Sequence, residues 1–160
     1  MLLLEKGENA MKVQVINAED AKISGVRFAF PGEENLLCSG HFEWRSFPLE
    51  TMLRTNKVIS GILQGWHRTV EFDTLEYHDD TENFYFTEGT CIMPFGTRVG
   101  DSVDPDSLQL VRIRPGTQVE VKAGKLHYVP IPLGDTFRAY VFTPLQESKF
   151  VQLPELLIGE

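Results

Sequence analysis

The sequence predicts an all-β protein built as an antiparallel sandwich or barrel. The first observation is a hydrophobic period of two, in which apolar and more polar residues alternate over residues 111–114, 119–122 and 137–142. The second is the frequency of turn residues between such runs: Pro31-Gly32, Gly61, Gly65, Gly89, Gly96, Pro115-Gly116, Gly124 and Leu133-Gly134-Asp135. Many short strands joined by glycine-rich turns are typical of these two architectures.

Helices are expected to be minor. Residues 104–107 read Asp-Pro-Asp-Ser, in which Asp104 can accept from free N–H groups and Pro105 fits a first helical position. Residues 144–157 could hold a second helix, interrupted at Pro154. The sequence therefore predicts one or two short helices.

Length and charge indicate a single domain without a nucleic-acid surface. The chain has 160 residues, with 15 Lys+Arg against 23 Asp+Glu and a net charge of −8. No apolar run reaches the roughly 20 residues of a membrane span. The apolar run at the start of the chain is too short for a signal peptide. Because two cysteines form no disulfide framework, we expect a cytoplasmic protein. Residues 1–10 are expected to form a flexible extension, with Met11 a second candidate start, and residues 11–160 one domain.

Residues 75–89, LEYHDDTENFYFTEG, contain the candidate site. On a strand, Glu76 and His78 point to the same face, and Glu82 enters a second strand after turn-forming residues 79–81. If these side chains face inward, a divalent metal would compensate the burial of the carboxylates, and mixed oxygen and imidazole ligands suit such an ion. The pattern does not identify the metal. A solvated hairpin end is the alternative interpretation.

The spacing resembles the two motifs of the cupin superfamily. Glu76-x-His78, Glu82 and Gly89 match the first motif, with Glu76 in place of its first histidine and Val70 in place of an earlier glycine. In the second, Gly116, Gly124 and His127 are in register, while Lys122 replaces a proline and Ile131 an asparagine. The resemblance implies a cupin-type barrel, known as a double-stranded β-helix or jelly roll, over residues 11–160, and adds His127 to the site. Without the motif, His127 would be interpreted as a structural histidine.

Within that superfamily the chain resembles the ureidoglycolate lyases, small cupins of allantoin breakdown in purine metabolism, over roughly residues 24–145. Leu75-Glu76-Tyr77-His78 matches the family's L-E-x-H, and Ile59-Ser60-Gly61-Ile62 resembles a family strand. The departures are a glutamine common near Glu82, a W-H-H-P pattern where this chain has Leu126 to Pro130, and an acidic residue without a match in 137–142. The resemblance implies cleavage of ureidoglycolate, or a related small hydroxy acid, to glyoxylate and urea.

The chemistry can be assigned to residues as a hypothesis. A metal on Glu76, His78, Glu82 and His127 could chelate the carboxylate and hydroxyl of the substrate. Alternatively Glu82 or Glu76 serves as the base, with His127 as the acid. For binding the substrate anion the candidates are Arg138, Lys125 and Tyr140.

Two other functional classes remain open: a metal-dependent isomerase, decarboxylase or dioxygenase acting on another small acid or sugar, and a small-molecule-binding protein without catalysis. As partners we expect a small anionic substrate and a second copy of the chain, but neither nucleic acid nor membrane. Small cupins tend to dimerise, and the apolar stretch around Phe42, Trp44 and Phe47 could supply the surface.

Overall fold

The computed structural model of the chain describes residues 9–32, 36–47 and 49–160. Its larger sheet has eight strands. In spatial order they are β1 (Ala10–Val13), β17 (Lys149–Gly159), β7 (Glu71–Tyr77), β14 (Leu126–His127), β9 (Cys91–Gly96), β12 (Gln109–Ile113) and β2 (Val15–Asn17), with β15 (Ile131–Pro132) also paired to β9. Two of the pairs, β1 with β17 and β12 with β2, are parallel, and the rest are antiparallel.

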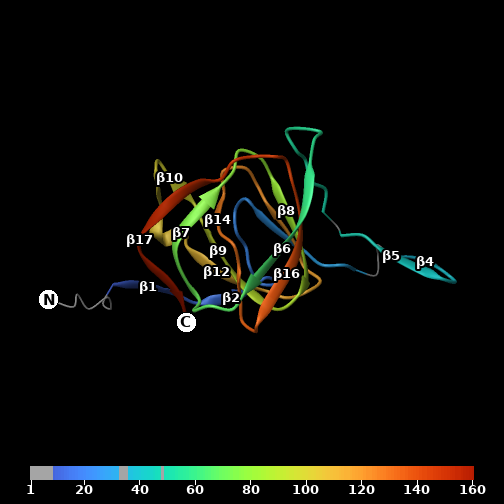
Figure 1. The fold of residues 1–160 in the computed structure, drawn as a ribbon, viewed down its shortest axis with the longest axis horizontal. Coiled ribbons are helices and arrows are strands. Elements are labelled where there is room, and N and C mark those ends of the chain that lie inside the picture. The colour runs from blue at the N-terminus through green and yellow to red at the C-terminus, as the bar shows by residue number, and fades with distance from the viewer. Residues whose placement is uncertain (1–8, 33–35, 48) are drawn as a thin grey trace.

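A second sheet of five antiparallel strands completes the barrel. Its order is β3 (Val26–Ala29), β13 (Gln118–Val121), β8 (Glu82–Glu88), β16 (Thr136–Thr143) and β6 (Ile59–Trp66). Figure 1 shows the strands of the two sheets curving around a common interior. The expected all-β, cupin-type barrel is therefore confirmed, with the two parallel pairs as an addition to the antiparallel pattern.

The described residues contain one short helix, the 3-10 helix η2 (Pro105–Ser107), where the sequence predicted it. Asp104 caps it, accepting a hydrogen bond from the Asp106 amide at 3.1 Å. The prediction of a helix within residues 144–157 is wrong, because that segment contains most of β17. Pro154 lies in the interval between Gln152 and Leu157 where the pairing of β17 with β7 shifts register, so its missing N–H interrupts no regular ladder.

The core consists of two clusters on opposite faces of the larger sheet. Cys91, Met93 and Phe95 of β9 belong to the cluster that also holds Phe86 and Phe137 of the smaller sheet. The second cluster contains the alternate residue Ile92 of β9 and Leu110 of β12, together with side chains of β7 and β17. The predicted alternation of residues 111–114 and 137–142 is confirmed, since Val111, Ile113, Phe137 and Ala139 are buried. Residues 119–122 differ because Glu120 is buried as well.

Residues 36–45 form a separate arm. Its strands, β4 (Leu36–Ser39) and β5 (Phe42–Arg45), pair with each other and form a sheet of their own. Figure 1 shows this hairpin extending away from the barrel. The chain returns to the barrel through residues 50–54. There the Thr51 hydroxyl donates to Glu120, and the amide of Arg54 donates to Asp80. The return segment is therefore fixed to the barrel, and the arm projects from it.

Residues 1–8 of the expected N-terminal extension lie outside the described residues, and Ala10 already belongs to β1. The described part of the chain contains no helix with the length and apolar character needed to cross a membrane.

Candidate functional site

Three strands bring the four predicted residues of the motifs together. Glu76, near the end of β7, is paired in register with His127 of β14, and His78 follows β7 directly. Ligand atoms of Glu76, His78 and His127 all lie within 4.8 Å of one another. Glu82 is the first residue of β8, and its Oε2 lies 3.2 Å from Nε2 of His78 and 3.1 Å from Nε2 of His127. The four side chains therefore form one cluster.

The turn between β7 and β8 is held by side-chain and backbone hydrogen bonds. Asp80 accepts from the amides of Thr81 and Arg54, and its own amide donates to the Gln146 side chain at 2.9 Å. Gly124, which has a φ of +78°, donates its amide to the carbonyl of His78 at 2.8 Å. These contacts fix His78 relative to β14 and the return segment, so the site rests on a rigid frame.

Both histidines are oriented through Nδ1. Nδ1 of His127 lies 2.9 Å from the carbonyl oxygen of Lys125, and Nδ1 of His78 lies 3.1 Å from that of Glu147. Because a carbonyl oxygen can only accept, both Nδ1 atoms carry a proton and donate it. Nε2 of each ring is thereby directed at the other members of the cluster. This is the arrangement in which metal-binding histidines are usually held.

Electrostatics within the cluster favour charge separation. Burial alone would raise the pKa of Glu82, but hydrogen bonds from His127 and His78, with their attraction, lower it to about 2. Burial alone would lower the pKa of His78, but hydrogen bonds to Glu82 and to the Glu147 carbonyl, and the charges of Glu82 and Glu76, raise it to about 9. These interactions favour an ionised Glu82 beside a protonated His78.

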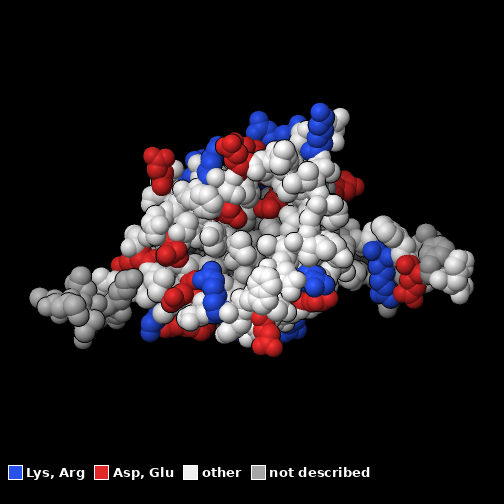
Figure 2. Space-filling model, in the orientation of Figure 1, with Lys and Arg blue, Asp and Glu red and all other residues white. Residues whose placement is uncertain are grey.

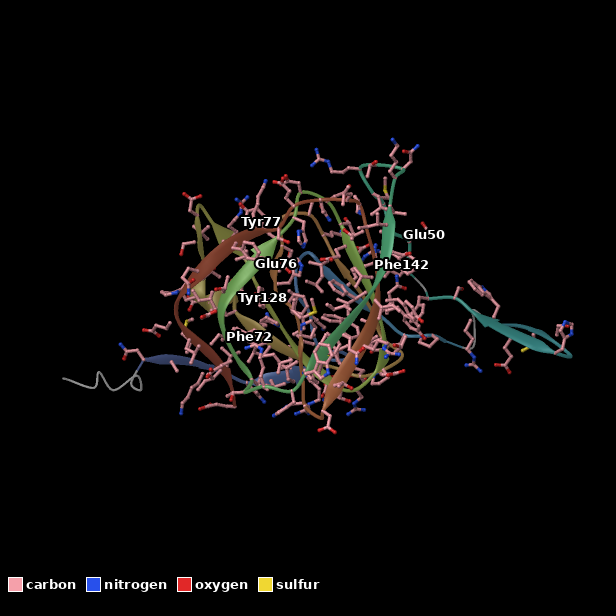
Figure 3. The ribbon with its side chains drawn as sticks, in the orientation of Figure 1. Glu50, Phe72, Glu76, Tyr77, Tyr128 and Phe142 are labelled. Atoms are coloured by element: carbon pink, nitrogen blue, oxygen red, sulfur yellow. The ribbon has the colours of Figure 1, made fainter. Side chains whose placement is uncertain are left out.

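A cavity of about 280 Å³ opens beside this cluster. Glu76, Glu82 and His127 line it together with residues of β6, β8, β16 and the segment after β14. Figure 3 shows Glu76 on β7 and Tyr128, which also lines the cavity, on the same side of the barrel. In Figure 2 the middle of this face is largely uncharged, with acidic atoms near its centre and basic side chains toward the periphery.

The cluster fits a divalent metal ion. Its donor set of two imidazoles and one or two carboxylates is the mixture that such ions accept, and the Nδ1 bonds leave each Nε2 available as a ligand. A cation bound to the Nε2 atoms would replace the protons through which the rings interact with Glu82. Glu76, His78 and His127 are therefore the candidate ligands, and Glu82 adjoins them.

The predicted substrate-binding residues do not line this cavity. Lys125 follows the turn after β13, and its ammonium donates to Thr97 Oγ1 at 3.1 Å, beside a different pocket. Arg138 and Tyr140 lie on β16 opposite the buried Phe137 and Ala139, so they face away from the barrel interior. The structure thus brings together the motif residues but not the three candidates for holding a substrate anion.

Sequence reasoning missed most of the cavity wall. The apolar residues that line it are Ile59, Ile62, Leu63, Phe84, Val129 and Val141. Ile62 is paired with outward-facing Tyr140, so its own side chain lies on the outer face of the sheet. Ile59 and Leu63 occupy alternate positions of β6, a pattern that indicates a half-buried strand but not that it borders a cavity. The Lys125 and Glu147 carbonyls that orient the histidines could not be found from residue types, because every residue carries a carbonyl.

Comparison of the chain with models of known protein families and with curated proteins found no match.

Proposed function

We propose that the chain is a metal-dependent enzyme that acts on a small hydroxy acid, with a divalent cation held by Glu76, His78 and His127. The observation that carries the proposal is the convergence of these three ligand atoms within 4.8 Å, two of them from residues that line a cavity, Glu76 and His127. When the cation is bound, the substrate would coordinate it through its carboxylate and its hydroxyl. The cation would lower the pKa of that hydroxyl. Motif resemblance makes ureidoglycolate the first substrate to test, with the expected products glyoxylate and urea.

Glu82 is our candidate for the proton-transferring group. It lines the cavity, and its Oε2 lies 3.2 Å from Nε2 of His78 and 3.1 Å from Nε2 of His127. In the proposed elimination Glu82 accepts the hydroxyl proton while the oxygen forms a carbonyl double bond. The carbon–nitrogen bond breaks, its electron pair moves to nitrogen, and Glu82 returns the proton there to release urea. One proton moves from oxygen to nitrogen, so no further reactant is needed.

The electrostatics of the cavity support a metal over direct binding of an anion. Glu76 and Glu82 are acidic, and no lysine or arginine is among the described residues of the lining. A carboxylate substrate would meet like charges there, which disfavours its binding. A divalent cation removes that repulsion and supplies a ligand-binding position. We therefore expect substrate binding, as well as catalysis, to depend on the metal.

The experiment is an assay of glyoxylate release from ureidoglycolate by chelator-treated protein, with and without added divalent metals. We expect release only with metal, and its loss in His78→Ala and in His127→Ala. A Glu76→Gln variant should lose metal, whereas Glu82→Gln should keep metal and lose at least about 100-fold in kcat. His67→Ala is the matched control, because His67 binds the Pro132 carbonyl and does not belong to the cluster.

Unchanged turnover in the double variant His78→Ala/His127→Ala would contradict the assigned site. Loss of metal in Glu82→Gln would make Glu82 a ligand and remove its role as base. Bound metal without glyoxylate release would remove ureidoglycolate as substrate, and the search would pass to other small hydroxy acids.

The donor set favours a second candidate, oxygen chemistry on iron. Two histidines and one carboxylate with open positions are the ligand set of non-haem Fe(II) oxygenases, and Glu76, His78 and His127 provide it. Iron in the purified protein, together with oxygen consumption in the presence of a small acid, would favour a dioxygenase. Activity with redox-inactive Zn²⁺ or Mg²⁺ would favour the elimination.

A further inference from the structure

The cavity separates a charged end from an apolar wall. Glu76, Glu82 and His127 occupy one end. The remaining described lining residues are mostly uncharged and apolar: Ile59, Gly61, Ile62, Leu63, Phe84, Val129 and Val141, with Ser60, Tyr128 and Thr143 as the polar members. A molecule held at the charged end therefore extends its remaining atoms along an apolar surface.

The wall begins next to the metal-binding cluster. The ring of Phe84 lies 6.3 Å from that of His127, centroid to centroid, in an edge-to-face arrangement. Phe84 is paired in register with Val141 of β16, and Val141 is paired with Gly61 of β6. Three neighbouring strands thus form one continuous surface that starts at the ligand His127.

Of the three polar residues of this wall, Thr143 already has its hydroxyl engaged within the protein. The hydroxyl of Thr143 donates to the carbonyl of Pro144 and accepts from Gln146 Nε2 at 2.7 Å. A urea group brought from water to this surface loses hydrogen bonds to water, whereas an alkyl group gains from leaving water. The wall therefore favours an alkyl group over a urea group on the carbon that bears the metal-binding hydroxyl.

Gly61 borders the open space of the cavity. A side chain at alternate positions of β6 faces the interior, since a Cβ at Gly65 would lie 2.4 Å from the ring of Phe137. At Gly61 an added Cβ would meet no atom within 4 Å, and Gly61 itself lines the cavity. Its φ is not positive, so a larger residue fits the backbone there. A side chain at position 61 can thus fill the cavity without disturbing the strand.

We infer that the substrate is a small 2-hydroxy acid whose second carbon carries an apolar substituent, with the substituent lying against β6, β8 and β16. This inference rests on the proposed metal-dependent function, because the metal holds the acid end. It ranks alkyl-substituted hydroxy acids above ureidoglycolate, whose substituent is polar. Because such acids have no carbon–nitrogen bond, their reaction at the proposed metal would differ from the elimination described above.

The test measures binding of glycolate, 2-hydroxybutanoate, 2-hydroxyhexanoate and ureidoglycolate to Co²⁺-loaded protein, through the visible spectrum of the bound ion. We expect affinity to rise by about fourfold for each added methylene. Gly61→Leu should abolish the rise while leaving Co²⁺ and glycolate binding unchanged. Gln64→Leu, on the same strand outside the cavity lining, should behave as the wild type.

The outcomes separate the two claims. Failure of the protein to bind Co²⁺ overturns the proposed function, and the inference falls with it. Bound Co²⁺ with affinity independent of chain length, or tightest for ureidoglycolate, overturns the inference alone. An equal effect of Gly61→Leu on all four acids would also contradict it, because a block of the entrance, rather than loss of the apolar wall, would then explain the variant.

Discussion

At the scale of single residues, the site depends on backbone groups as much as on its motif residues. Carbonyls of Lys125 and Glu147 accept the Nδ1 protons of His127 and His78. Both carbonyls belong to segments fixed elsewhere, since the Lys125 amide binds the Lys122 carbonyl and Gln146 binds Thr143. The two rings are therefore held in place before any ligand arrives, which reduces the ordering that binding would require.

A second buried cluster at this scale gives a pH prediction. Glu120, which is 1% exposed, accepts two hydrogen bonds from Arg27 at 2.8 Å and one from Thr51 at 2.6 Å. Burial favours the neutral acid, but these bonds and the charge of Arg27 outweigh it and lower the pKa of Glu120 below its ordinary value of 4.5. The ionised pair therefore stabilises the fold at neutral pH.

The sign of the pH dependence follows from that lowered pKa. The stabilisation is fully present above pH 4.5 and is lost as the pH falls toward the folded-state pKa. We expect Glu120→Gln to reduce the free energy of unfolding by about 2 kcal/mol at neutral pH and to lose this part of the acid sensitivity. Urea denaturation between about pH 3 and 7 measures both. Parallel curves for wild type and variant would contradict the assignment.

The grouping of Glu76, His78 and Glu82 was predictable from their spacing around one turn, whereas His127 was added by the resemblance to the second cupin motif. The register of β7 and β14 places His127 beside Glu76, and Glu82 at the start of β8 contacts both histidines. Lys125 and Arg138 were chosen by charge alone, and charge does not say which way a side chain points. Lys125 turns toward Thr97, and Arg138 faces Glu88 and Gln64 outside the barrel. The alternation over residues 119–122 places Glu120 on the polar face, and the local pattern does not reveal its buried ion pair because the partner, Arg27, is 93 residues away.

At the scale of elements, the tail shows a limit of local reasoning. Residues 144–157 contain charges, two prolines and no strict alternation of apolar and polar residues, so the sequence pattern does not indicate a strand there. The segment instead forms β17 because β7 and β1 offer it two edges to pair with. Val151, Leu153 and Leu157 complete the second core cluster. Tertiary pairing and burial outweighed local preference there.

The turn between β8 and β9 gives an element-scale prediction. Gly89 has a φ of +72°, and an added Cβ would lie 2.1 Å from the Thr136 carbonyl oxygen. We expect Gly89→Ala to lower the free energy of unfolding by at least about 2 kcal/mol and the Tm by about 4–8 °C. Gly134→Ala is the control, because a Cβ there meets nothing within 4 Å and should cost under about 0.5 kcal/mol. Equal Tm values for the two variants would contradict this account of the turn.

At the scale of the whole molecule, two exposed features suggest a partner. Within the described part of the chain, no strand pairs with the arm of β4 and β5 from outside it, and Trp44 on the arm is 61% exposed. An isolated two-stranded hairpin is only marginally stable in water. The outer face of the smaller sheet exposes five large apolar side chains: Ile62, Trp66, Tyr85, Tyr140 and Phe142. Figure 3 shows Phe142 on the side of the barrel that faces the arm.

We propose that a second copy of the chain covers these surfaces, because two-fold homodimers are the commonest soluble assemblies and the patch is apolar. Light scattering should give twice the monomer mass of 18.2 kDa. The double variant Tyr140→Lys/Phe142→Lys should be a monomer. Leu133→Lys changes an exposed apolar residue between β15 and β16, outside this patch, and should remain a dimer. A monomeric wild-type protein at micromolar concentration would contradict the proposal.

The central claim is that Glu76, His78 and His127 bind one divalent metal ion, and metal analysis after dialysis tests it most directly. Chelator-treated protein would be reloaded with Zn²⁺, Mn²⁺, Fe²⁺ or Co²⁺ and compared with His78→Ala/His127→Ala and with His67→Ala. The account predicts about one equivalent per chain for at least one ion in wild type and His67→Ala, and none in the double variant. Absence of stoichiometric metal in the wild type, or equal binding by the double variant, would contradict it.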